Sequence, residues 1–149
     1  MPNSPSAVRR RPRTTIATGI AALLMLVSAG AAAADITGPD VSSHQHPNGA
    51  SVDWSKVRNS GQNFAIVKST EGVSYVNPYF SSDWNAIKAN GMVRGSYHYA
   101  RPDGSPTSAA EQARYFVSVA GRMQASGDLA PALDLEDTGG LSPSQLVTW

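Results

Sequence analysis

The sequence contains no cysteine. Without disulfides, a small domain must take its stability from a packed apolar core. Residues 35–149, which follow a basic and then apolar leading segment, are numerous enough to build one such core. We therefore expect a single small domain after position 34.

Two signatures of nucleotide or nucleic-acid binding are also missing. No glycine-rich phosphate loop follows the first predicted strand, at 37–42, which argues against a dinucleotide site. Four of the twelve basic residues lie in the leading segment, which leaves eight against eleven acidic residues and a net charge near −3 from Asp35 onward. Because nucleic acids require a basic surface, we expect no nucleic-acid partner.

Residues 1–34 have the pattern of a secretory signal peptide. Four arginines between positions 9 and 13 precede an apolar core at 16–27, and alanines 31–34 offer cleavage sites before Asp35. The apolar core is short for a membrane span, so we expect cleavage and secretion rather than a stable membrane anchor. Residues 35–149 are then the exported part.

The exported part alternates between predicted strands and helices. Strands are expected at 37–42, 63–69, 92–100 and 129–136. Helices are expected at 54–59 after an Asp53 cap, at 79–89 after an Asn77 cap, at 105–122, and from Ser142 onward. Successive β-α units predict a parallel sheet with helices outside it, either an open doubly wound sheet or an α/β barrel.

In both architectures, chemistry gathers at the carboxyl ends of the strands. The polar and aromatic residues at those ends are Asp40, Lys68, Glu71, Tyr97, His98, Tyr99, Asp134 and Glu136. Asp134 and Glu136 stand two residues apart, so in a strand they share one face. Of two adjacent carboxyl groups, one tends to keep its proton and can act as an acid while the other stays charged. Such a pair can cleave a glycosidic bond, and the alternative is a pair of solvated acids at a strand end.

The other candidates have structural alternatives as well. Tyr97 and Tyr99 share a strand face and either border a sugar site or pack in the core, and His98 should point the opposite way as a hydrogen-bonded structural residue. Lys68 and Glu71 can form a structural ion pair. Further expectations are a solvent-facing or turn-capping Asp137 and core positions for Trp54 and Trp84.

Two other classes of protein remain possible at this point. His44 and His46 form an H-x-H pair after the first strand, where metal-dependent amidohydrolases bind zinc, although His98 is the one further histidine in the sequence. A module that holds a cell-wall glycan without cutting it is the non-enzymatic alternative.

Five segments in order resemble glycoside hydrolase family 25: residues 40–45, 52–54, 64–72, 95–100 and 134–136. The resemblance runs from about Gly38 to Glu136. It implies a secreted lysozyme, an N-acetylmuramidase with an irregular TIM-like (β/α) barrel. Such enzymes hydrolyse the β-1,4 bond between N-acetylmuramic acid and N-acetylglucosamine in peptidoglycan.

The resemblance also implies roles for single residues. Glu136 matches the proton donor, Asp134 its acidic neighbour, and Asp40 a third acid at the floor of the groove. Negative neighbours favour the protonated form that an acid catalyst needs, while the other carboxylates stabilise oxocarbenium charge. The implied substrate-binding residues are Tyr97, Tyr99, Glu71 and Lys68. We expect a monomer that binds peptidoglycan glycan strands, with no cofactor and no metal.

Members of the family continue through further strands that close the barrel, whereas this sequence stops at Trp149 inside a predicted helix. We therefore expect residues 35–149 to be the N-terminal part of the catalytic domain, truncated after about four β-α units. Four parallel strands leave an unpaired, apolar sheet edge, so this segment alone is expected to aggregate or to be inactive.

Overall fold

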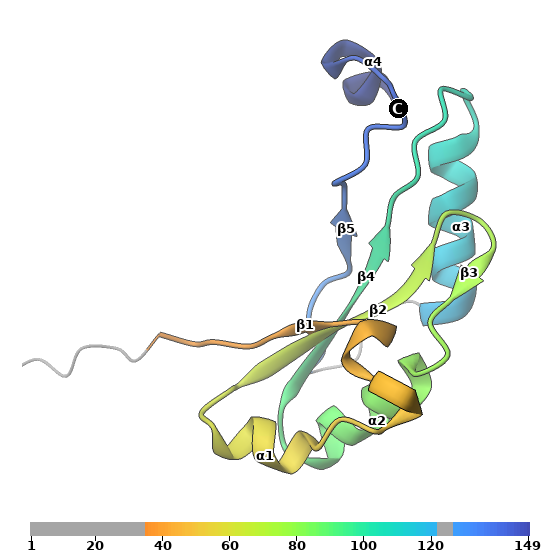
Figure 1. Ribbon diagram of the computed structural model, residues 1–149. Helices are drawn as coiled ribbons and strands as arrows, with labels where there is room; N and C mark the ends of the chain where they lie inside the picture. Colours follow the sequence, from red (N-terminus) through yellow and green to blue (C-terminus); the bar gives the residue numbers. More distant parts are fainter. Residues whose placement is uncertain (1–34, 122–126) are drawn as a thin grey trace, which may run out of the picture. The chain divides into compact units, whose positions relative to one another are not determined.

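The computed structural model describes residues 35–121 and 127–149, whose helices and strands are shown in Figure 1. The predicted signal peptide and the predicted end of the third helix, at Arg122, lie outside the described residues. In the two described ranges, no helix combines the length and the apolar character needed to cross a bilayer.

A mostly parallel sheet forms the centre of the described chain. Its strands span Asp40–Val41 (β1), Phe64–Glu71 (β2), Tyr75–Val76 (β3), Val93–Tyr99 (β4) and Ala132–Asp134 (β5). The strand order is β1-β2-β4-β5, and these four strands run parallel, which confirms the predicted α/β fold. Strand β3 was not predicted; it pairs antiparallel with the end of β2. The closed barrel stays a prediction.

Helices lie between the strands in the predicted order. They span Trp54–Asn59 (α1), Phe80–Ala89 (α2), Ser108–Ala120 (α3) and Pro143–Thr148 (α4), and two 3-10 turns at Ser43–Gln45 and Pro47–Gly49 follow β1. Asp53 caps α1 as predicted, because its carboxylate accepts the backbone N–H of Lys56 at 3.1 Å. Ser142 and Gln145 form a capping box at the start of α4. The predicted starts of both helices are confirmed.

Asn77 does not cap α2, so this prediction was wrong. The helix begins at Phe80 with Tyr79 at its N-cap position, so Asn77 lies two residues before the cap. Asn77 is instead almost fully buried; its amide donates to the carbonyl of Lys68 at 2.8 Å and its oxygen accepts the N–H of Tyr79 at 3.1 Å. Asn77 thereby joins β2 to the segment that leads into α2.

Strand β5 is shorter than the predicted strand at 129–136. In the described chain its neighbour is β4, and their register runs from Tyr97 opposite Ala132 to Tyr99 opposite Asp134. Because β4 ends at Tyr99, the residues after Asp134 have no strand beside them. Glu136 therefore lies on the connection that leaves the sheet, not on a strand face shared with Asp134.

The helices and the sheet enclose the core, with α2 packed on β2 and β4 and α3 packed on β2. Its buried members are Val41, Trp54, Ala65, Val67, Phe80, Ile87 and Met92. Trp54 is therefore a core residue, as predicted, and Trp84 packs against the core while partly buried. Burial of these side chains supplies the stability that disulfides do not. The core also holds the parallel strands in register, so their carboxyl ends meet at one edge.

Candidate active site

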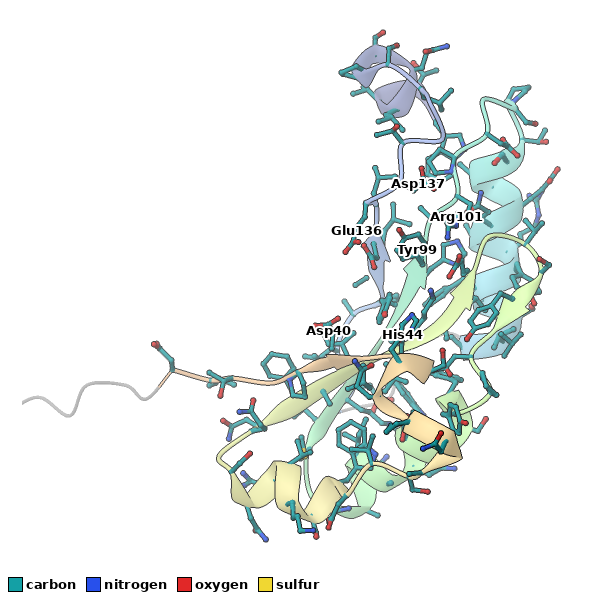
Figure 2. All side chains as sticks on the ribbon, viewed as in Figure 1. Asp40, His44, Tyr99, Arg101, Glu136 and Asp137 are labelled. Atoms are coloured by element: carbon teal, nitrogen blue, oxygen red, sulfur yellow. The ribbon has the colours of Figure 1, made fainter. Side chains whose placement is uncertain are left out.

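The three predicted acids line one cavity. Its volume is about 350 Å³, and its walls are formed by Asp40, Ile66, Tyr97, Ala132, Leu133, Asp134 and Glu136. Asp40 begins β1, Asp134 ends β5, and Glu136 follows two residues later. Asp134 is half-buried, whereas Asp40 and Glu136 are exposed to solvent. Figure 2 labels Asp40, at the start of β1, and Glu136, on the connection after β5. Residues nearly a hundred positions apart thus form one acidic groove.

Tyr97 is the buried residue of this groove, with 9% of its surface exposed. Burial raises the pKa of its phenol to about 12, and the negative charges of Asp40 and Asp134 add to the effect. The phenol therefore keeps its proton at neutral pH. It supplies a hydrogen-bond donor among three carboxyl groups that, when ionised, can only accept.

A network of charged residues lies beside this groove. Lys68 and Glu71 form the predicted ion pair, and the Nζ atom of Lys68 lies 4.5 Å from the ring centroid of Tyr99. Burial alone would raise the pKa of Glu71, but hydrogen bonds from Lys68 and Arg101 outweigh burial and lower it. Glu71 therefore carries its charge at neutral pH.

His98 points away from the groove, as predicted. Its Nδ1 lies 2.8 Å from Oγ1 of Thr70, and its Nε2 lies 3.1 Å from Oε1 of Gln112. The ring also meets Phe116 edge-on, with 6.0 Å between centroids. With both nitrogens bonded inside the protein, His98 is a structural residue.

Arg101 was missed by the sequence reading. Its Nη1 atom donates to Oδ2 of Asp137 at 2.5 Å, and its Nη2 donates to Oε1 of Glu71 at the same distance. Asp137 also accepts the N–H of Gly139 at 2.8 Å, which confirms its predicted role in a turn. Arg101 follows the carboxyl end of β4, so the rule that selected the other candidates, applied two residues further, would have found it.

The H-x-H pair does not form a metal site. His46 is buried, with Nε2 2.8 Å from Oδ2 of Asp83 and Nδ1 2.9 Å from the carbonyl oxygen of Ala50, whereas His44 is exposed. Both nitrogens of His46 are therefore engaged within the protein. Across residues 35–121 and 127–149, no group of three or more metal-ligating side chains is placed to hold an ion.

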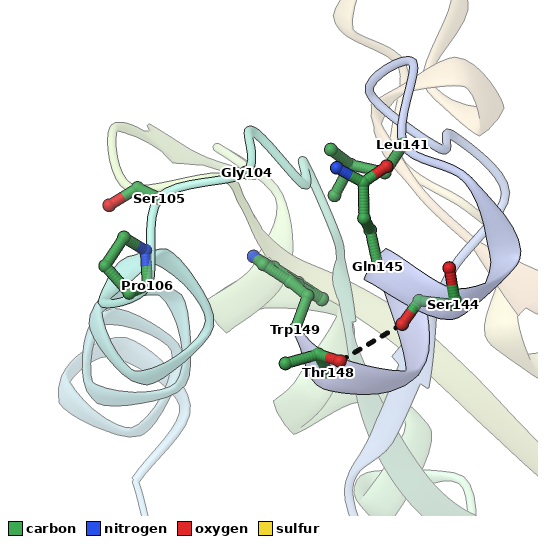
Figure 3. A pocket seen from close by; sticks show the side chains of 8 residues that line it. All are labelled: Gly104, Ser105, Pro106, Leu141, Ser144, Gln145, Thr148 and Trp149. Atoms are coloured by element: carbon green, nitrogen blue, oxygen red, sulfur yellow. Dashed lines mark hydrogen bonds between the residues drawn. The ribbon is translucent and has the colours of Figure 1, made fainter.

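Other cavities of larger volume have no acidic side chain in their lining. One, of about 390 Å³, is shown in Figure 3 and is lined by Gly104, Ser105, Pro106, Leu141, Ser144, Gln145, Thr148 and Trp149. A second, of about 460 Å³, lies among α3, β5 and α4 and is mostly apolar. A third, of about 400 Å³, is lined by Ile36, Arg58, Asn63, Phe64, Gly91, Val93 and Leu129. None of them presents an acidic side chain, so the acid-lined groove is the candidate active site.

An acid-lined groove at the carboxyl edge of a parallel sheet places the protein among the α/β folds that can perform carboxylate chemistry. The family model for glycosyl hydrolases family 25 matches residues 39–149. The chain belongs to this family, and the resemblance seen in the sequence is confirmed.

Individual relatives agree with this assignment. The chain is 40% identical over 124 residues to the N,O-diacetylmuramidase of Chalaropsis sp, covering 76% of this chain and 56% of that protein. It is 37% identical over 121 residues to Lysozyme M1 of Streptomyces globisporus, covering 76% and 39%. The solved muramidase from Trichobolus zukalii matches with a TM-score of 0.68 and 36% identity, over 77% of this chain and 56% of that one. The chain spans about half the length of such relatives or less.

Proposed function

We propose that the protein is a secreted muramidase that hydrolyses the β-1,4 bond between N-acetylmuramic acid and N-acetylglucosamine in bacterial peptidoglycan. The observation that carries this proposal is the convergence of Asp40, Asp134 and Glu136 on one groove around Tyr97. Membership of family 25 and the names of its relatives support the choice of substrate. We further propose that the protein acts as a monomer in the extracellular space.

In the proposed reaction, Glu136 is the general acid. It donates a proton to the glycosidic oxygen as the bond to the anomeric carbon breaks. Asp134 and Asp40 remain charged and stabilise the positive charge that develops on the sugar ring. The N-acetyl group of the substrate is a candidate internal nucleophile, which Asp134 would orient. Water completes the hydrolysis, and Glu136 is returned to its protonated form.

We propose that the substrate is bound by Tyr97, which lines the groove, and by residues beside it. Tyr97 offers a protonated hydroxyl at the buried side of the groove. Beside the groove, Tyr99, Lys68 and Glu71 form a cluster in which the lysine lies against the tyrosine ring and pairs with the glutamate. Because the charges of Lys68 and Glu71 compensate each other, we propose that they shape the sugar site and hold Tyr99 in place.

The proposed activity belongs to a complete catalytic domain. Leu133, within β5, and Leu135, just after it, are 61% and 44% exposed, and apolar side chains in such positions favour coverage by another element. We propose that the sheet is part of the irregular TIM-like barrel predicted from the sequence, in which further strands would provide that cover.

Digestion of purified peptidoglycan by the full-length protein tests the function. Mass analysis of the released muropeptides should show N-acetylmuramic acid at the new reducing end. Glu136→Gln should abolish release while the protein still binds cell walls. Glu111→Gln, an exposed change on α3, should leave release intact. Binding by the wild type without release of any fragment would instead identify a wall-binding module.

A further inference from the structure

We propose that Arg101 is the positioning residue for Glu136, holding the connection that carries this acid through an ion pair with Asp137. The proposal rests on the proposed function, because it concerns the geometry of the acid in that reaction. It gives a role to Arg101 and Asp137, which lie in the charged network beside the groove and take no part in the proposed reaction itself.

Two hydrogen bonds, one on each side of Glu136, join its chain segment to the residues that follow β4. On one side, the N–H of Ala100 donates to the carbonyl of Asp134 at 2.8 Å, which is the last backbone bond between the β4 and β5 segments. On the other side, Nη1 of Arg101 donates to Oδ2 of Asp137 at 2.5 Å. Glu136 has left the strand ladder, so its backbone depends on these two anchors. Figure 2 shows Arg101, Asp137 and Glu136 in this arrangement.

Arg101 can act as an anchor because the protein holds it from several sides. Its Nε and Nη2 atoms both donate to Oε1 of Glu71, at 2.9 and 2.5 Å. Its backbone N–H donates to the side-chain oxygen of Gln112 at 2.9 Å, and its carbonyl accepts the amide of the same glutamine at 2.7 Å. Its guanidinium carbon lies 4.7 Å from the ring centroid of Tyr99. The connection after β5 is thereby tied to β2, β4 and α3.

The exposure of this ion pair indicates that its role is to position Glu136 and not to stabilise the fold. The side chains of Arg101 and Asp137 are 48% and 40% exposed, and ion pairs in such surroundings contribute little to the free energy of unfolding. Displacing a catalytic group by about 1 Å, in contrast, can lower a rate by about a hundredfold. Loss of the pair should therefore lower kcat far more than it lowers stability.

A second ion pair joins the β4 and β5 segments at their opposite end and can serve as a control. Nε of Arg94, at the start of β4, donates to Oδ1 of Asp128 at 2.9 Å, and these side chains are only 12% and 5% exposed. Residue 128 precedes β5 just as Asp137 follows it. Breaking this pair should destabilise the fold more, because it is more buried. It lies away from the acids, so it should leave kcat of the folded enzyme unchanged.

The experiment compares Arg101→Gln, Asp137→Asn, their double variant and Arg94→Gln in the full-length protein, with thermal unfolding and steady-state kinetics on peptidoglycan. We expect kcat to fall about ten- to a hundredfold in each of the first three, with KM changed less than about twofold. The double variant should lose no more kcat than Arg101→Gln alone, because that change already removes the pair with Asp137. Arg94→Gln should lower the unfolding temperature and keep kcat.

Arg101→Lys completes the series. An ammonium keeps the positive charge but lacks the planar fork that makes two bonds to Glu71 and one to Asp137, so kcat should recover only in part. Wild-type kcat in Arg101→Gln, or an equal loss of kcat in Arg94→Gln, would overturn the positioning role. A wild type that releases no muropeptides would overturn the proposed function instead, and the two failures are therefore distinguishable.

Discussion

The Nε2 atom of His46 lies 2.8 Å from Oδ2 of Asp83 in the interior of the protein, and both side chains are less than 5% exposed. The opposite nitrogen of the ring lies 2.9 Å from the carbonyl oxygen of Ala50. Each ring nitrogen therefore lies within hydrogen-bond distance of an oxygen inside the protein. Asp83 also accepts the indole N–H of Trp54 at 3.0 Å, and the ring of Tyr79 stacks on His46. This cluster fixes the turns after β1 to α1 and α2.

Removal of Asp83 should therefore destabilise the fold. Asp83→Ala leaves His46 and the indole of Trp54 without their shared acceptor in a buried site, and we expect a loss of about 3 kcal/mol in the free energy of unfolding. Urea denaturation followed by circular dichroism measures this loss. Exposed Glu111→Ala is the control and should change stability by about 0.5 kcal/mol or less. A similar small effect for Asp83→Ala would contradict a structural role for the cluster.

Tyr97 should make stability depend on alkaline pH. Its pKa is raised from the ordinary value of 10.0 to about 12, mainly by burial, so the native state holds the phenolic proton more tightly than the unfolded state. This contribution is fully present below pH 10.0 and is lost as pH rises toward about 12. Between these pH values, the free energy of unfolding should fall with increasing pH at the rate expected when the native state binds about one proton more than the unfolded state.

Tyr97→Phe isolates this contribution. The variant has no phenol at position 97, so its stability should decline less steeply between pH 10 and 12 than that of the wild type. Denaturant unfolding at several pH values gives both slopes. Parallel curves for the two proteins would show that burial does not hold the proton of Tyr97.

Contacts within a few residues were open to prediction from the sequence, because the chain itself brings the partners together. The cap of α1 by Asp53 and the box formed by Ser142 and Gln145 are of this kind. The grouping of candidate acids was also predictable, since parallel strands present their carboxyl ends at one edge.

Contacts between distant segments were not predictable in the same way. The pair formed by Arg101 and Asp137 joins residues 36 positions apart, and no local pattern relates them. Strand β5 ends early because β4, its neighbour, ends at Tyr99. Asparagine is a residue type that often caps helices, yet the side chain of Asn77 donates to the carbonyl of Lys68 in β2 because tertiary packing brings the two together. In each of these cases the partner lies on another element.

The charged form of Glu71 should add to the free energy of unfolding at neutral pH, and this contribution should be lost in acid. Burial raises its pKa, but hydrogen bonds from Lys68 and Arg101 lower it below the ordinary value of 4.5. A lowered pKa contributes stability that is present above the unfolded value and is lost as pH falls through the folded one. Glu71→Gln should cost about 1 kcal/mol near pH 7, since the pairs are partly exposed. The difference from the wild type should shrink below pH 4.5; a difference that stays constant down to pH 2 would contradict this contribution.

Asp134 should be required for catalysis but not for folding. It is half-buried at the end of β5, where its carbonyl accepts the N–H of Ala100 while its carboxyl lines the acidic groove. Asp134→Asn keeps the backbone bond and the side-chain volume but removes the charge proposed to stabilise the oxocarbenium ion. We expect kcat to fall about a hundredfold or more, with an unfolding temperature close to that of the wild type.

Kinetics on peptidoglycan and thermal unfolding of Asp134→Asn provide both values. Asp103→Asn serves as a control for the loss of one carboxylate, because Asp103 is exposed on the connection before α3 and does not line the groove. If both variants lost activity equally, general surface charge would explain the effect. Loss confined to Asp134→Asn would localise the required charge to the groove, since the two changes alter net charge by the same amount.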